Sequence, residues 1–232
     1  MKKIIFTTLL FFVVLCSWSQ SGTIKVEEGK VVKGQFFFDK LYIFDNYLDG
    51  RIILNNGRHY TGPININTVT QSVRIISQEG DTIQIESENK VDVISAEGVF
   101  FRKKNNLYIE LLNTDGERSL GLVRKMAIGS EKIAGAYGGT SETSSVSKLG
   151  ALENKAESRF TILSKVANME YFYTELLYIL YKNKIVLATK RNFQKAFPGQ
   201  KKVISNYLQE NSIDFSKKES VISLFNYLIE NK

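Results

Sequence analysis

Tight turns recur along the N-terminal half of the chain and restrict how it can fold. Between residues 36 and 126, short stretches of β-branched and aromatic residues are separated by turn pairs such as Asp49-Gly50, Asn56-Gly57 and Asp115-Gly116. Asn-Gly and Asp-Gly pairs supply the positive φ angles that two-residue hairpin turns need. Thr82-Ile83-Gln84-Ile85-Glu86 alternates polar and apolar residues, which is typical of a strand with one face in a core. The pattern predicts an antiparallel meander curled into a roll or an open barrel.

Residues 135 to 150 differ in composition from the segments on either side. They are rich in Gly, Ser and Thr and poor in apolar side chains, which predicts a flexible loop or linker. Their glycines and hydroxyls lack the lysine and the strand-to-helix context of a phosphate-binding loop. The predicted organisation is an antiparallel β domain over residues 20 to 134, this linker, and a small α+β module over residues 151 to 232.

The C-terminal module is predicted to contain a β-hairpin followed by helices. Two apolar runs flank Lys182-Asn183-Lys184, Thr189 can cap a short helix, and Pro198-Gly199 ends that helix. Ser216 and Glu219 form a capping box for the last helix. The predicted fold class is therefore α+β, mainly β, closing with a helical hairpin packed against itself or the sheet. Apolar residues at helical spacing define the two closing helices: Val203, Ile204, Tyr207 and Leu208, then Val221, Leu224, Phe225 and Leu228.

The first nineteen residues have the pattern of an export signal. Lys2 and Lys3 precede an apolar run that ends at Cys16, which suits a signal peptide but is short for a membrane span. Small residues on either side of Trp18 predict cleavage between Ser19 and Gln20. A retained N-terminal anchor and a lipoprotein acylated at Cys16 remain alternatives. We expect the mature chain in the periplasm, at the outer-membrane periphery or outside the cell.

The cysteine content and the hydropathy of the sequence indicate which features the mature protein lacks. Cys16 is the one cysteine of the chain, so the mature protein is expected to have neither disulfides nor a thiol nucleophile. After the signal, the best candidate for a membrane span is the apolar stretch from Leu176 to Ala188, and Lys182, Asn183 and Lys184 interrupt it. No transmembrane segment is therefore expected in the mature chain.

The positive charge is concentrated towards the C-terminus. The formal net charge is +7, and no Asp or Glu occurs between Glu175 and Glu210. Such a stretch predicts a basic interaction surface for an envelope protein, a glycan or an anionic lipid surface. Aromatic residues could also stack on unpaired bases, but export makes a nucleic-acid partner unexpected. The basic surface is predicted to consist of Lys182, Lys184, Lys190, Arg191, Lys195, Lys201 and Lys202.

Two stretches resemble uncharacterised exported proteins of the Bacteroidota. One begins Tyr47-Leu-Asp-Gly-Arg-Ile-Ile-Leu-Asn-Asn-Gly, and the other is Tyr181-Lys-Asn-Lys-Ile-Val-Leu with Phe197-Pro198. The matches are mostly turn and core positions, so the resemblance implies an exported protein and no particular activity. In that context Asp81-Thr82-Ile83 resembles the acceptor pattern for O-glycosylation at Thr82, the alternative being an ordinary junction between turn and strand.

No catalytic, cofactor-binding or metal-binding set is recognisable in the sequence. His59 is the one histidine and lies on a predicted strand without a partner nearby in the chain. The acid pairs Asp45 with Asp49 and Glu79 with Asp81 lie at predicted turns, where acids are common for backbone reasons. The sequence favours a non-enzymatic envelope binding protein of unknown ligand. The alternative is a hydrolase that acts on glycan with carboxylates brought together by folding.

Overall fold

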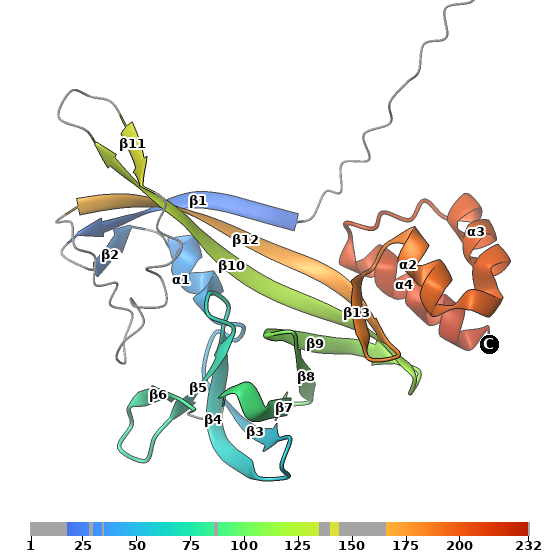
Figure 1. The fold of residues 1–232 in the computed structure, drawn as a ribbon, viewed down its shortest axis with the longest axis horizontal. Coiled ribbons are helices and arrows are strands. Elements are labelled where there is room, and N and C mark those ends of the chain that lie inside the picture. Colours follow the sequence, from blue (N-terminus) through green and yellow to red (C-terminus); the bar gives the residue numbers. More distant parts are fainter. Residues whose placement is uncertain are drawn as a thin grey trace, which may run out of the picture.

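The computed structural model describes residues 18–27, 30–33, 35–85, 88–134, 140–143 and 166–231. These residues form one large antiparallel sheet with a group of helices at the C-terminal end (Figure 1). The chain is mainly β, and the sheet does not close on itself. The predicted fold class, an antiparallel meander followed by a β-hairpin and helices, is confirmed.

The order of strands in the sheet is β2-β1-β12-β10-β9-β8-β7-β3-β4-β5-β6, with β11 paired to β10 and β13 paired to β12. The strands are β1 Trp18–Glu27, β2 Lys30–Lys33, β3 Leu48–Leu54, β4 His59–Asn67, β5 Ser72–Ile76, β6 Thr82–Gln84, β7 Val91–Ala96, β8 Val99–Lys104, β9 Leu107–Thr114, β10 Arg118–Ala134, β11 Thr140–Thr143, β12 Val166–Tyr181 and β13 Lys184–Leu187. The helices are α1 Gln35–Leu41, α2 Lys190–Ala196, α3 Lys201–Glu210 and α4 Lys218–Glu230, with short 3-10 turns at Glu88–Lys90 and Pro198–Gln200.

Most of the predicted turns are hairpin turns in the structure. Gly57 has a φ of 81°, and Asn105 and Asn106 between β8 and β9 have φ angles of 51° and 58°. Asn adopts this left-handed region more readily than most residues because its short side chain hydrogen-bonds locally. Asp49-Gly50 is an exception, because both residues lie inside β3. A Cβ on Gly50 would lie 2.5 Å from Ile64 Cδ1, so this glycine allows a close approach between β3 and β4.

Phe36-Phe37-Phe38 is not a strand but part of helix α1. In a helix, residues four apart share a face, and Phe37 and Leu41 are both buried against the sheet. The Phe36 ring stacks on Tyr171 with 5.9 Å between ring centroids. The helix thereby buries these rings on one side and leaves Phe38 partly exposed. A strand would have needed a covering layer on both of its faces.

The C-terminal segment contributes a strand to the same sheet as the meander. Strand β12 pairs with β10 from Tyr181, opposite Arg118, to Tyr171, opposite Ile128, and pairs with β1 along its other edge. Of the predicted linker, Thr140–Thr143 forms β11 beside β10, and the remainder lies outside the described residues. The division into two domains stays a prediction, although the described strands on both sides of the linker belong to one sheet.

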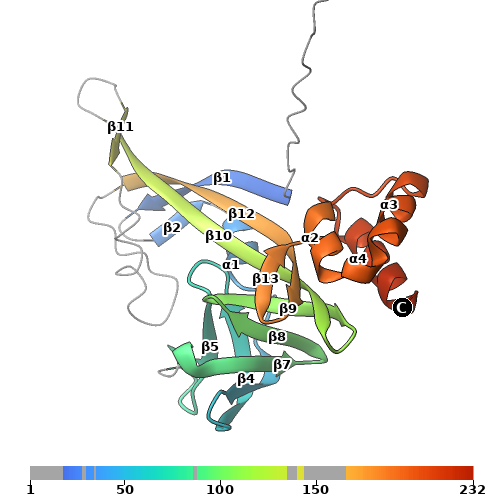
Figure 2. The same cartoon turned by 45° about the vertical axis from the view of Figure 1, so that its right-hand side comes forward.

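The two faces of the sheet have different roles. We call the face that carries the hydrophobic clusters the inner face and the opposite one the outer face. Side chains alternate between them along a strand, so Leu122 points inward and Val123 points outward. Figure 2 shows α2, α3 and α4 at one end of β10 and β12, and α1 nearer the other end. The described core divides into a helix cluster with α2 to α4, a meander cluster within β3 to β9, and an α1 cluster.

The helices follow their predicted apolar spacing. Thr189 caps α2, accepting a hydrogen bond from the Asn192 backbone N–H, as predicted. The predicted stripe of α4 is fully buried in the helix cluster. The predicted capping box is wrong, because Lys217 is the N-cap of α4 and makes no side-chain capping bond. The Ser216 hydroxyl instead donates to Asp214 Oδ1 at 2.5 Å. Among the residues that the structure describes, no helix is both long and apolar enough to span a membrane.

The turn between β4 and β5 hydrogen-bonds to both β9 and β10. Gln71 Nε2 donates to the Arg124 carbonyl of β10 at 2.9 Å, and Gln71 Oε1 accepts from the Tyr108 N–H of β9 at 3.2 Å. The Met126 N–H donates to the Thr68 carbonyl at 3.0 Å. The turn therefore supplies hydrogen bonds at the place where β9 and β10 no longer pair with each other, and it keeps the meander folded against the long strands.

Candidate functional site

The cations of the predicted basic surface lie at one end of the molecule. Lys182 and Lys184 are in the β12–β13 hairpin, which leads directly into α2 and then α3 (Figure 1). All of these side chains are exposed. Within the described residues, none of them lies within salt-bridge distance of a carboxylate. The group consists of Lys182 and Lys184 of the hairpin, Lys190, Arg191 and Lys195 of α2, and Lys201 and Lys202 of α3.

Packing of the helices fixes the outward direction of these cations. In α2 the buried residues are Phe193 and Ala196, and in α3 the buried residue is Ile204. The Phe193 and Phe197 rings stack on each other in the helix cluster, with 6.2 Å between centroids. Because one face of each short helix is held in the core, the lysines on the other faces stay in solvent. The basic surface is therefore presented by a well-packed scaffold.

Folding also brings together a charged group that the sequence did not reveal. Arg124 of β10 forms an ion pair with Glu110 of β9, and its Nε lies 3.5 Å from Glu175 Oε1 of β12. The Tyr173 hydroxyl donates to Glu175 Oε1 at 2.8 Å. We call these four residues the Arg124 cluster. It lies on the inner face between the helix cluster and the α1 cluster, and its Arg124 and Glu110 side chains are mostly buried.

The Arg124 cluster links three neighbouring strands, β9, β10 and β12, through one arginine. A glycosidase places its two carboxylates on either side of the substrate, whereas Arg124 contacts both Glu110 and Glu175. Burial, with the hydrogen bond to Glu175 and its charge, raises the pKa of Tyr173 above its usual range. Its hydroxyl therefore remains protonated and donates to Glu175. The sequence held one signal of this cluster, which is polar residues at inward positions of otherwise apolar strands.

A second charged group stabilises the meander. Lys103 Nζ lies 2.7 Å from Glu88 Oε1 and donates to the Glu88 carbonyl at 2.8 Å. The Tyr108 hydroxyl donates to the same carboxylate, and Lys103 Nζ lies 4.8 Å from the centre of the Tyr108 ring. Burial, with the charge of Glu88, raises the pKa of Tyr108 above its usual range. These contacts join the turn before β7 to β8 and β9.

The residues considered for catalysis are not gathered by the fold. His59 is exposed at the start of β4, opposite Ile53 of β3. The acids Asp45, Asp49, Glu79 and Asp81 are also exposed. In the part of the chain that the structure describes, no group of three or more His, Cys, Asp and Glu side chains is placed to hold a metal ion.

Two predicted processing sites fall on strands. Ser19 and Gln20 belong to β1, opposite Thr174 and Tyr173 of β12, while residues 1 to 17 lie outside the described residues. Thr82 begins β6 and is half-buried. Cleavage of the signal and glycosylation of Thr82 stay predictions.

Comparisons with models of protein families, with curated proteins and with solved structures found no match to this chain. The resemblance to exported proteins of the Bacteroidota stays a prediction.

Proposed function

We propose that this chain is an exported, non-enzymatic binding protein of the cell envelope, and that its basic surface holds an anionic partner. The observation that supports this function is the exposure of many cations at one end of the molecule, with no ion pair to any of them among the described residues. Like charges held close together repel each other and attract an anionic partner from solution. The N-terminal export pattern would bring the chain to the cell envelope, where it would meet such a partner.

The alternative, a glycan hydrolase that uses two carboxylates, has less support. The acids considered from the sequence are exposed. Glu110 and Glu175, which the fold brings together, are held by the same arginine. An aromatic-walled cleft between two free carboxylates would favour a hydrolase, and the described contacts of the Arg124 cluster are instead those of a structural ion-pair group.

Charge reversal on the basic surface tests the proposal. The variant changes Lys190, Arg191 and Lys201 to Glu, and binding to an isolated envelope fraction is measured by sedimentation. We expect binding to fall by roughly tenfold or more because the local positive field is removed. The same loss should occur in the wild-type protein when salt is raised, since surface electrostatics are screened within about 8 Å at 0.15 M salt.

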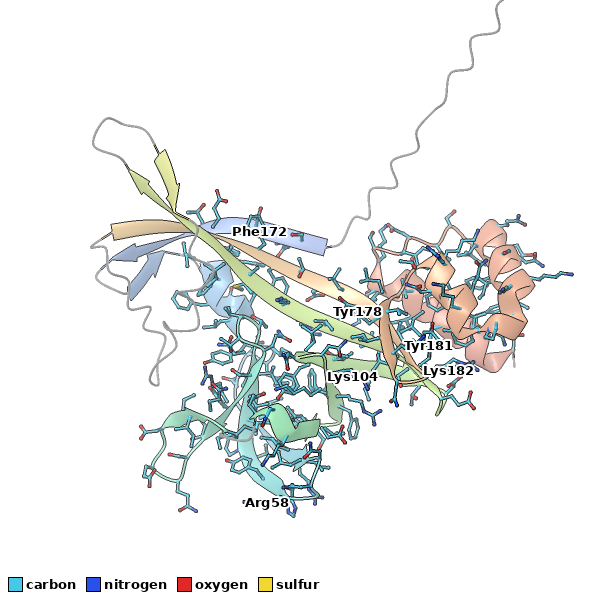
Figure 3. The ribbon with its side chains drawn as sticks, in the orientation of Figure 1. Arg58, Lys104, Phe172, Tyr178, Tyr181 and Lys182 are labelled. Atoms are coloured by element: carbon cyan, nitrogen blue, oxygen red, sulfur yellow. The ribbon has the colours of Figure 1, made fainter. Side chains whose placement is uncertain are left out.

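A matched control makes the same change in net charge elsewhere on the molecule. Arg51, Arg58 and Lys90 are exposed residues of the meander, and Figure 3 shows Arg58 at the end of the meander that is remote from Lys182. Reversing these three to Glu should leave binding within about twofold of wild type, because the basic surface is intact. Equal binding by both variants and wild type would refute the proposed function.

A further inference from the structure

The outer face of β10, β12 and β13 carries large apolar side chains that no described helix or strand covers. Phe172 and Leu187 are 42% and 38% exposed. Tyr178 lies on the same side of β12 as Phe172, because they are an even number of residues apart in one strand. Apolar and aromatic inward residues of the same strand belong to the inner clusters: Tyr171, Tyr173, Leu177 and Ile179. The three described clusters all lie on the inner face, so within the described part of the chain no further layer packs on this outer surface.

Strand register places these outward residues in neighbouring rows. Tyr178 is opposite Leu187 of β13 on one side and Gly121 of β10 on the other. Phe172 is opposite Ala127 of β10, which is also exposed. Burial raises the pKa of the Tyr178 hydroxyl, in keeping with a ring that lies partly against its neighbours. Figure 3 shows Phe172 and Tyr178 spaced along β12.

The apolar outer surface continues across β9 to β8. Ile109 of β9 is opposite Arg102 of β8, and Phe100, two residues before Arg102, is 51% exposed on the same face. Two other outward residues of this region, Ile109 and Val123, are almost inaccessible to solvent. We call Phe100, Phe172, Tyr178 and Leu187 the outer patch.

Cations accompany the outer patch, and one acid, Glu170, stands at the outward position two residues before Phe172 in β12. Lys125 is exposed and opposite Thr174, between the rows of Phe172 and Tyr178. Arg102 is exposed beside Phe100. No Asp or Glu stands at an outward position of β8, of Leu107 to Leu111, of Ser119 to Ala127, of Phe172 to Leu180, or of β13. The hairpin of the basic surface adjoins this region at Leu180 and Ile185.

We infer that the outer patch docks on an anionic lipid membrane, with its aromatic and aliphatic side chains in the interfacial zone and its cations on lipid phosphates. Aromatic rings favour the membrane interface, and Lys and Arg side chains near an anionic lipid surface are attracted to it. The inference rests on the proposed function, because it names the anionic partner as a lipid surface. The outer face of the sheet would thus be a second binding surface, in addition to the basic surface.

The spread of the outer patch favours a membrane over a protein partner. Phe172 and Tyr178 are six residues apart in one strand, about 20 Å at 3.3 Å per residue. The patch also crosses from β8 to β13, four strand spacings or about 19 Å. Protein interfaces concentrate binding energy in a compact central group, whereas a lipid surface accepts separate side chains. A second copy of this chain is disfavoured, because packing two outer patches face to face would bring together the cations Lys125 and Arg102 of both copies.

Vesicle sedimentation tests this inference. The probes are vesicles of phosphatidylcholine alone and of phosphatidylcholine mixed with phosphatidylglycerol. We expect wild-type protein to bind the mixed vesicles, and a variant with Phe100, Phe172 and Tyr178 changed to Ser to bind them at least tenfold more weakly. Exposed apolar residues elsewhere supply the control. Changing Phe38 and Ile83, which are 37% and 44% exposed, to Ser should leave binding within about twofold, because these residues lie outside the outer patch.

Tryptophan fluorescence gives a second measurement, on variants in which one aromatic side chain replaces another. Phe172→Trp should show a blue-shifted emission on mixed vesicles relative to the parent protein, and Phe38→Trp should show none. Thermal melting of each variant, followed by circular dichroism, establishes that it is folded. An unshifted Phe172→Trp spectrum, with wild-type binding by the Ser variant, overturns the inference.

The other outcomes separate this inference from the proposed function. If the outer-patch variant loses binding to the envelope fraction while wild type binds neither vesicle, the partner is a protein or glycan and membrane docking is wrong. If wild type forms a dimer in sedimentation analysis that the outer-patch variant does not form, the patch binds a second copy and the inference is wrong. In either case, loss of envelope binding on reversal of Lys190, Arg191 and Lys201 would still support the proposed function.

Discussion

The inner and outer faces of β10 and β12 are made by alternate residues of the same two strands, yet they differ in how their charges are satisfied. On the inner face, Arg124 contacts Glu110 and Glu175. One residue later on the outer face, Lys125 is exposed opposite Thr174, and among the described residues it has no carboxylate within salt-bridge distance. The inner charges therefore connect the parts of the fold, whereas Lys125 on the outer face remains in solvent.

Apolar residues divide in the same way. Inward residues of β12 pack against the helices at one end and against α1 at the other, whereas Phe172 and Leu187 face solvent. Since burial rather than residue type sets the contribution to stability, equivalent substitutions on the two faces should have very different effects. Three predictions test this comparison, in order of expected size.

The largest effect is expected from Phe225→Ala. Phe225 is fully buried in the helix cluster and meets the Phe197 ring edge to face at 5.8 Å. Its truncation leaves a cavity and should lower the free energy of unfolding by about 4 kcal/mol. Phe172→Ala on the outer face is the matched control, with a loss of less than about 0.5 kcal/mol. Urea unfolding of both variants measures the difference, and similar losses would break the distinction between the faces.

An intermediate effect is expected from Arg124→Gln. The change leaves Glu110 and Glu175 close together without their common cation, and removing one partner of a largely buried ion pair costs about 3 kcal/mol. The control Arg102→Gln removes an exposed arginine of β8 and should change stability by less than about 1 kcal/mol. Chemical denaturation of the two variants gives both values. A loss for Arg124→Gln no greater than that of its control would mean that the Arg124 cluster does not support the inner face.

The smallest of the three effects is expected from Gln71→Ala. This change removes the amide that bridges the Arg124 carbonyl and the Tyr108 N–H, and leaving such buried groups without partners costs about 2 kcal/mol. Gln78→Ala, in the exposed turn before β6, should be neutral within about 0.5 kcal/mol. Hydrogen exchange should also show the Tyr108 amide exchanging faster in the Gln71 variant. Unchanged protection there would contradict the bridging role.

Local patterns were enough to predict most elements of the fold. Asn56-Gly57 and Lys182-Asn183 mark hairpins because positive φ angles favour few residue types. The stripe of Leu224, Phe225 and Leu228 predicts the buried side of α4 because helical residues three and four apart share a face. The exposure of the basic surface follows from the same spacing in α2.

Features that depend on residues far apart in the chain could not be predicted in this way. The Arg124 cluster takes one residue from each of β9 and β10 and two from β12, and no spacing in the sequence marks their contact. Phe36-Phe37-Phe38 has the composition of a strand, but these residues lie in a helix, from which the Phe36 and Phe37 rings pack against Tyr171. Ser216 has the position of a capping residue, yet its hydroxyl is held by Asp214.

The amino-acid order alone determined the antiparallel strands, the turns between them, the apolar stripes of the closing helices and the cations that stay in solvent. These features depend on backbone preferences and on side-chain period, which act over a few residues. Tertiary structure decided which face of β10 and β12 received the helices, and therefore that Arg124 is paired and Lys125 is not. Alternation in a strand separates two faces, but only the packing of distant segments selects the one that is covered.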